Sequence, residues 1–409
     1  MRTASLCSLF VLLLCAACDQ GGGPAASVAP SAPVSASASA SASTSTSASA
    51  VSQDVPAFRG NSARTGVVPG PGPIDHAAVA WTASLGAPIR TAIVTAGGLA
   101  FVSADDGTVA TFDLASGQLR WRESISTSPL STPEVVDGIV VVGTATDGLR
   151  ALDAATGRAI WSVATDGRVA GAPADGDGLV VFGSDGGTVE AVDLSTGATR
   201  WTASAGDPVI SSIAIGEGAV VVGTNGGTRS GTVASFDLAG GRLRWRTPVG
   251  YAGRVGTPAI AEGRVFAATG LDGQGDGIHH VVALDLGTGA IDWQYQSAAG
   301  LPVYTPAVRS GAAFVTGEDR TVTELDPATG AVAWSTNVEG VIEGNPVVAA
   351  SAVYATTNGG AAIAIDAATG RQLWSVPIKG NPYGPTVAGG LLLVGTDLGT
   401  LYAIGGTLP

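Results

Sequence analysis

Residue types that commonly carry catalysis are few in this chain and poorly placed for it. The histidines are His76, His279 and His280. His279 and His280 are neighbours and would point to opposite faces of a strand, so they cannot easily bind one metal ion together. The sequence has neither a Gly-x-Ser-x-Gly nucleophile elbow nor a phosphate-binding glycine loop with a lysine. These residues predict no catalytic site and no histidine metal site, so we do not expect an enzyme.

One segment partly matches a calcium-binding loop. Asp272 and Asp276, followed by Gly277, fit the opening of the Asp-x-[Asp/Asn]-x-[Asp/Asn]-Gly pattern. Gln274 replaces one of its carboxylates, and Ala283 stands where the pattern needs Glu. A glycine-rich hairpin without metal is the favoured interpretation. The sequence leaves open whether this loop binds calcium.

The cysteines lie together at the start of the chain. Cys7, Cys15 and Cys18 all precede residue 19, so the rest of the chain has no thiol nucleophile, thiolate metal site or disulfide. A positive residue, a short apolar run and small residues before Cys18 are typical of an export signal. The last four of these residues resemble the bacterial lipobox, whose cysteine is acylated. We expect residues 1–18 to be a lipoprotein-type signal peptide and Cys18 to carry the lipid.

The next segment, residues 19–55, is rich in Ser, Ala and Pro and cannot form a core. We predict a disordered linker, which as a flexible coil would reach roughly 35 Å on average. The folded body would then stand off the membrane surface. We expect an exported, membrane-anchored lipoprotein facing the periplasm or the cell surface. The choice between inner and outer membrane stays open.

Composition favours short strands over long helices. Glycine makes up 60 of 409 residues and charged residues 13%, and each glycine inside a helix would cost roughly 1 kcal/mol. The net charge is −13 and Lys379 is the sole lysine, with no basic stripe, so nucleic acid is not an expected partner. No apolar stretch reaches the ~18 residues that a membrane-spanning helix needs.

All eight tryptophans recur at nearly constant spacing. They are Trp81, Trp121, Trp161, Trp201, Trp245, Trp293, Trp334 and Trp374. The intervals of 40 to 48 residues are typical of propellers with four short strands per blade. The last seven each end the motif Asp-x-x-x-Gly-x-x-x-Trp. We expect Asp and Gly to form the turn between third and fourth strands, Gly through a positive φ, and each Trp to dock against the neighbouring blade.

The ends of the repeat predict how the ring closes. In the second unit, the expected strands span residues 130–136, 138–144, 149–153 and 158–164. After Trp374 the chain supplies only three strands, over residues 384–404, while residues 77–84 carry an extra Trp81. Pairing this N-terminal strand onto the last blade removes the open sheet edges. We predict an all-β, eight-bladed β-propeller of four-stranded antiparallel blades over residues 56–406, with a tail at 407–409.

The repeat resembles the tryptophan-docking repeat of the quinoprotein (pyrroloquinoline-quinone-like) propellers. The lead-in Phe58–Gly66, of sequence FRGNSARTG, also resembles the segment before the first blade in that group. This resemblance covers residues 56–406 and implies the fold. It does not imply one activity, because the group includes quinone-dependent dehydrogenases and also non-enzymatic lipoproteins of the BamB type, which belong to the outer-membrane assembly machinery.

The dehydrogenases of this group carry a vicinal cysteine pair beside the cofactor and a calcium held by carboxylates and Asn. Residues 19–409 contain no cysteine. The leader, linker and bare propeller match the BamB-type arrangement better. We therefore expect a monomeric, lipid-anchored scaffold that binds a protein partner in the cell envelope and needs neither PQQ nor calcium. The alternatives are a PQQ-dependent oxidoreductase and a sensor with a small ligand in the central funnel.

Two features point to one face of the ring as the binding surface. Units four and five are longer than the others, by insertions around 225–231 and 271–280 that we expect between the second and third strands. Such loops share a face with the starts of the innermost strands, where several units carry Arg, Tyr or Glu, and Arg and Tyr are favoured anchors. The candidate partner-binding residues are Arg90, Arg168, Asn225, Arg229, Arg254, Asp272, Asp276, Tyr304, Glu343 and Tyr383.

Overall fold

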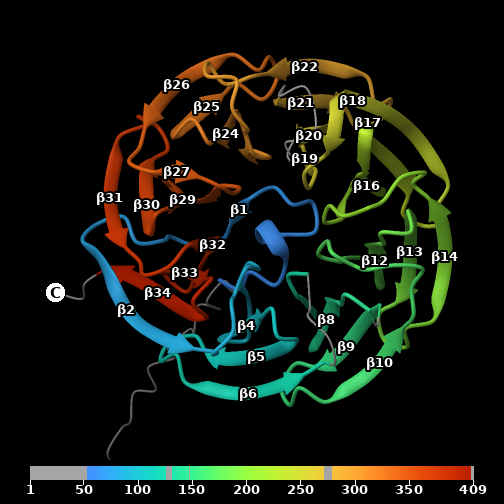
Figure 1. Cartoon of the computed structure of the whole chain (residues 1–409), viewed down its shortest axis with the longest axis horizontal. Coiled ribbons are helices and arrows are strands. Elements are labelled where there is room, and N and C mark those ends of the chain that lie inside the picture. The colour runs from blue at the N-terminus through green and yellow to red at the C-terminus, as the bar shows by residue number, and fades with distance from the viewer. Residues whose placement is uncertain (1–52, 126–130, 147, 271–278, 407–409) are drawn as a thin grey trace, which may run out of the picture. The chain divides into compact units, whose positions relative to one another are not determined.

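The computed structural model describes residues 53–125, 131–146, 148–270 and 279–406. These residues form eight sheets arranged as blades around a ring (Figure 1). The four main strands of each blade are antiparallel, and in the first seven blades these strands follow the chain from the innermost to the outermost. This confirms the predicted all-β, eight-bladed propeller. None of the helices within the described ranges is long and apolar enough to cross a membrane.

The first four blades follow one another without interruption along the chain. Their strands are β3 (Val94–Ala96), β4 (Leu99–Ser103), β5 (Thr108–Asp113) and β6 (Leu119–Ser124); β7 (Glu134–Val136), β8 (Ile139–Gly143), β9 (Leu149–Asp153) and β10 (Ala159–Val163); β11 (Ala174–Gly176), β12 (Leu179–Gly183), β13 (Thr188–Asp193) and β14 (Thr199–Ser204); β15 (Ala214–Gly216), β16 (Ala219–Gly223), β17 (Asn225–Asp237) and β18 (Leu243–Arg254).

The last four blades include the two pieces contributed by the N-terminal part of the body. Their strands are β19 (Ala259–Ala261), β20 (Arg264–Thr269), β21 (His280–Asp285) and β22 (Ile291–Tyr295); β23 (Ala307–Arg309), β24 (Ala312–Thr316), β25 (Thr321–Leu325) and β26 (Val332–Asn337); β28 (Val347–Ala349), β29 (Ala352–Asn358), β30 (Ala361–Asp366) and β31 (Gln372–Pro377), with β1 (Val67–Val68) and β27 (Val341–Ile342) added; β32 (Pro382–Ala388), β33 (Leu391–Thr396), β34 (Thr400–Gly406) and β2 (Ala77–Ser84).

The ring closes as the sequence predicts. Strand β2 pairs antiparallel with β34, from Ala77 opposite Gly406 to Ser84 opposite Thr400. The last blade therefore takes three strands from the C-terminal end and one from the N-terminal end of the body. This pairing ties the two ends of the repeat together.

The innermost strands are shorter than the pattern predicts. An inner strand was expected over residues 130–136, whereas β7 begins at Glu134. Near the axis the blades converge, and backbone N–H groups there bond to side chains of the next blade instead of a sheet partner. The Ala92 N–H donates to Thr132 Oγ1 at 3.2 Å, and the Ala172 N–H donates to Ser212 Oγ at 3.0 Å. The ladder therefore starts later than hydrophobicity alone suggests.

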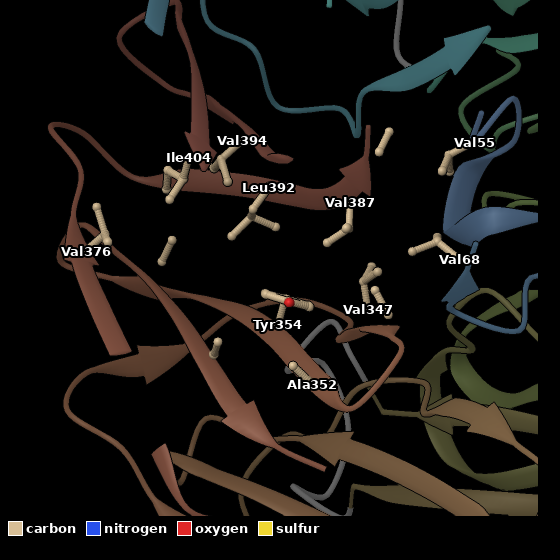
Figure 2. Close-up of a cluster of buried hydrophobic side chains, with 14 of the residues drawn as sticks. Val55, Val68, Val347, Ala352, Tyr354, Val376, Val387, Leu392, Val394 and Ile404 are labelled. Atoms are coloured by element: carbon tan, nitrogen blue, oxygen red, sulfur yellow. The ribbon is translucent and has the colours of Figure 1, made fainter. Parts of the chain in front are cut away.

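The hydrophobic core lies between neighbouring blades. Strand β8 is a continuous apolar run whose Val140, Val141 and Val142 are fully buried, because both of its faces meet another blade. Figure 2 shows the cluster at the closing end of the ring, where Tyr354 of β29 and Leu392 of β33 pack together. Each blade thus depends on its neighbours for burial of its apolar faces.

The tryptophans join each blade to the next. Trp201 on β14 donates its indole N–H to the Leu238 carbonyl of the following blade at 2.8 Å. In the same turn, Asp237 Oδ1 accepts the Gly240 N–H. Gly241 has φ 68°, and a Cβ there would overlap the Trp201 ring. The motif glycine therefore provides a positive φ and also the space in which the previous blade's tryptophan docks.

The insertion of blade four is not the loop that we predicted. Residues 225–231 belong to β17, and its partner β18 continues to Arg254. The pairing extends from Thr232 opposite Pro248 to Asn225 opposite Arg254. The added residues extend both strands and pair irregularly, with register shifts on either side of Ser230, so they lengthen the sheet. Most of the blade-five insertion, residues 271–278, lies outside the described residues.

Candidate functional site

The lead-in segment crosses the centre of the ring. We call Val55–Val68 the plug; it includes the short 3-10 turn η1 (Phe58–Gly60), drawn blue at the middle of Figure 1. Its carbonyls accept N–H bonds from the innermost strands of six blades. The pairs are Val55 with Thr95, Pro56 with Val135, Ser62 with Ile215, Ala63 with Ile260, Thr65 with Val308 and Gly66 with Val348. This segment closes one end of the central channel.

Two buried arginines hold the plug in place. Arg59 is 4% exposed and Arg64 is fully buried. Arg59 Nε donates to the Arg64 carbonyl at 3.0 Å and Arg59 Nη1 donates to the Thr305 carbonyl at 3.1 Å. Arg64 Nε donates to the Ile213 carbonyl at 2.8 Å. Both residues have left-handed backbones, at φ 59° and 57°, which cost about 1 kcal/mol or more each and persist only where the surroundings enforce them.

Arg64 also has a buried carboxylate partner. Its Nη1 lies 3.2 Å from Glu134 Oε2, and both side chains are at most 1% exposed. Burial raises the pKa of Glu134 to about 8, although the charge of Arg64 acts in the opposite direction and Asp175 adds to the rise. Asp175 Oδ1 in turn accepts a hydrogen bond from Ser62 Oγ of the plug at 2.6 Å. This network binds the plug to blades two and three.

The plug forms the floor of a cavity of about 420 Å³. All eight blades contribute to its wall, and Phe58 and Arg59 contribute from the plug. The wall residues precede the innermost strands or lie at their start, whereas the plug bonds to residues within those strands. The cavity is therefore a funnel that opens on the face where the inner strands begin, and its size is within the range of ligand pockets.

Five of the residues selected from the sequence meet in this funnel. Arg90, Arg254, Tyr304, Glu343 and Tyr383 all line it, although three of them lie on irregular backbone and the other two lie on strands β18 and β32. Arg254 ends β18 and does not begin an inner strand as the repeat alignment suggests. The convergence of eight blades on one axis brings these residues together.

Most charged groups at the funnel mouth are already paired. Arg90 forms an ion pair with Asp105 of its own blade. Tyr304 donates its hydroxyl to Glu318 Oε1 at 3.0 Å, and burial together with the Glu318 charge raises the pKa of Tyr304. Similar pairing engages Glu343, whose Oε1 accepts a hydrogen bond from Asn358 Nδ2 at 2.9 Å.

The other selected residues lie elsewhere or outside the described structure. Arg168 pairs with Asp185 and is not part of the funnel lining. Asn225 is also absent from the lining, and its Oδ1 accepts the Gly227 N–H at 2.9 Å. Arg229 lies on β17, but its side chain is not described. Cys18, Asp272 and Asp276 lie outside the described residues.

Sequence reasoning missed the floor of the funnel. Phe58 and Arg59 were noted only as part of a family-like lead-in, and nothing in the repeat alignment places a segment before the first blade on the axis. One signal was present: two arginines stand within nine residues of a chain that has 20 Lys and Arg among 409 residues.

A family model described as outer membrane protein assembly factor BamB matches this chain over residues 74–212, 105–270 and 185–405. The three matches overlap, as expected for repeats that align in several registers, and together they span most of the propeller. The chain belongs to this family. No curated protein sequence matches it significantly.

Solved structures with the same fold include proteins of very different kinds. BamB from Moraxella catarrhalis is 18% identical, with a TM-score of 0.66 over 80% of this chain and 99% of that chain. The quinohemoprotein alcohol dehydrogenase from Comamonas testosteroni is 16% identical, with a TM-score of 0.68 over 87% and 81%. The computationally designed Ika8 protein is 18% identical, with a TM-score of 0.68 over 78% and 96%. At such identities the likeness shows the fold alone.

Proposed function

We propose that this chain is a non-enzymatic, BamB-like scaffold of the cell envelope that binds a protein partner at the funnel mouth. The observation that carries the proposal is the funnel itself, which has eight-bladed walls, a closed floor and a mouth bearing Arg90, Arg254, Tyr304 and Tyr383. Arg and Tyr are the residues that most often anchor partners. Family membership supports an envelope role, because the family description names outer membrane protein assembly.

The proposed anchor is a lipid on Cys18, joined to the propeller by the Ser/Ala/Pro-rich linker of residues 19–55. The lipobox-like residues before Cys18 support it. Metabolic labelling with a clickable fatty acid, with Cys18→Ser as the control, tests the anchor independently of the partner.

In-cell crosslinking followed by affinity capture tests the partner site. The double variant Arg254→Ala/Tyr304→Ala should lose capture, at about 1 kcal/mol or more per anchor, while its thermal unfolding stays near that of the wild type. Arg200→Ala is the control, since Arg200 pairs with Asp193 in a turn at the outer edge of its blade, away from the funnel. Capture that survives the double variant but is lost on changing the outer turns would place the partner elsewhere.

A PQQ-dependent oxidoreductase is the second candidate, because the dehydrogenase neighbour has the same fold and the funnel is large enough for a small ligand. The residues do not fit the calcium that accompanies the cofactor in that group. Within the described ranges, no cluster of three or more His, Cys, Asp or Glu could hold a metal ion. Glu343, a carboxylate of the funnel wall, already bonds to Asn358. A saturable rise in Tm with PQQ and calcium, together with alcohol oxidation, would favour this alternative.

A further inference from the structure

Two arginines of the funnel lack a carboxylate partner. Across the described residues, Arg254 on the wall forms no ion pair, and Arg59 on the floor bonds only to backbone carbonyls. Other arginines behave differently: Arg90 pairs with Asp105, and Arg64 pairs with Glu134. The funnel therefore holds positive charge that no carboxylate of the described residues pairs with.

Arg59 is a buried positive charge, and burial disfavours its charged form. It is 4% exposed, and burial together with the charge of Arg64 lowers its pKa to about 9. A buried charge without a counter-ion destabilises the folded state, so an anion placed in the funnel would offset part of that cost. Glu343 on the wall and Glu318 behind Tyr304 keep their charge, because their hydrogen-bond partners Asn358 and Tyr304 are neutral. Within the described ranges, neither forms an ion pair with Arg59 or Arg254.

The shape of the funnel limits how an anion can arrive. The plug closes the far end, so a macromolecule must enter tip first from the mouth. A cavity of about 420 Å³ cannot hold a folded domain, but it suits the end of an extended chain. The leading group of that end meets Arg254 on the wall and Arg59 at the floor.

We propose that the funnel receives the acidic end of a partner polypeptide, with a carboxylate held by Arg254 and Arg59. This inference rests on the proposed function, since a protein partner presents its negative charge as carboxylates. Guanidinium groups match carboxylates through paired, charge-assisted hydrogen bonds. Tyr383, which also lines the funnel, adds an aromatic surface for the adjoining residue.

Peptide binding to the full chain, purified in detergent, tests the inference. One probe is a fluorescein-labelled Gly-Ser-Gly-Ser-Asp-Glu with a free C-terminus, and the other is its neutral counterpart, Gly-Ser-Gly-Ser-Asn-Gln amide. Anisotropy should show the acidic peptide binding at least about tenfold more tightly, as expected for charge-assisted bonds. A third probe, the acidic sequence with an amidated end, separates a terminal carboxylate from side-chain carboxylates.

Variants assign the binding to the funnel. Arg254→Gln should weaken the acidic peptide about tenfold and leave the neutral one unchanged, whereas Arg200→Gln, which changes an arginine paired with Asp193 outside the funnel, should change neither. Arg59→Gln should act like Arg254→Gln if its Tm shows a folded protein. Should it unfold, Arg254→Gln decides the matter alone.

Several outcomes would overturn the inference. They are equal binding of acidic and neutral peptides, no effect of Arg254→Gln, and binding of free succinate without binding of any peptide. Partner capture distinguishes this failure from failure of the proposed function. If the crosslinked partner still needs Arg254 and Tyr304 while the peptides bind alike, the mouth is a docking surface that does not recognise carboxylates.

Discussion

The outer ring and the axis of this propeller are built in opposite ways. The outer ring repeats one device, in which a tryptophan such as Trp201 docks over the motif glycine of the next blade and bonds to its backbone. The axis is occupied by a segment that occurs once, the plug, and its two arginines reach different blades. Repetition gives the ring its shape, and the unrepeated segment breaks its symmetry.

The ion pairs of the outer ring also differ from the ion pair on the axis. In the outer turns Arg120, Arg200 and Arg244 each pair with the aspartate of their own motif at an exposed surface. Exposed pairs of this kind contribute little to stability. On the axis, Arg64 and Glu134 pair in full burial. The difference teaches that stability in the ring comes from packing, while the position of the plug depends on a few buried polar contacts.

The largest expected effect is loss of the axial pair. Arg64→Ala leaves Glu134 and several buried backbone carbonyls without their donor. Because each unsatisfied buried acceptor costs roughly 1–3 kcal/mol, the variant should lower the free energy of unfolding by about 3–5 kcal/mol. Urea unfolding followed by tryptophan fluorescence measures this loss. Arg200→Ala, in the outer ring, should be nearly silent. Equal losses for the two variants would remove the contrast between axis and ring.

The next largest effect concerns the glycine over which each tryptophan of the ring docks. Gly241→Ala would combine a strained positive φ with overlap on the Trp201 ring, and should cost about 2–4 kcal/mol. Gly263 has nearly the same φ, 69°, but nothing lies within 4 Å of a Cβ there. Gly263→Ala should therefore show only the strain, about 1–2 kcal/mol. If the two glycines respond alike in thermal unfolding, tryptophan docking does not require the space.

The effect expected to be smallest over a single pH unit is a pH dependence of the axis. Glu134 keeps its proton to about pH 8 in the folded chain, against an ordinary pKa of 4.5. Between these values the folded state binds the extra proton, so the free energy of unfolding should fall as pH rises, by at most about 1.4 kcal/mol per pH unit. The contribution is complete below pH 4.5 and is lost as pH rises through 8.

Urea midpoints from pH 5.5 to 8.5 for wild type and Glu134→Gln isolate this term. The wild type should lose stability relative to the variant as pH rises. The outer ring should respond in the opposite direction at acid pH, because a hydrogen bond from Arg200 holds the pKa of Asp193 below its usual range. A constant difference between wild type and Glu134→Gln would show that Glu134 does not titrate in this window.

The sequence by itself determined the ring. Tryptophan spacing, the Asp-x-x-x-Gly turns and the extra strand with Trp81 were enough to predict eight blades and their closure, because these contacts lie within one repeat or between adjacent repeats. The same alignment placed Arg90, Arg254, Tyr304, Glu343 and Tyr383 at one mouth. The repeat pattern predicts these positions, because each blade packs against a neighbour of the same kind.

Only the tertiary structure decided what lies on the axis. The plug bonds to residues far along the chain, as Gly66 does with Val348 and Thr65 with Val308, and no repeat encodes contacts of that range. Burial then fixed the roles of its arginines: Arg64 received an acidic side chain, Glu134, and Arg59 received only backbone carbonyls. Whether a charge is compensated depends on every element that converges on it, and that convergence exists only in the folded ring.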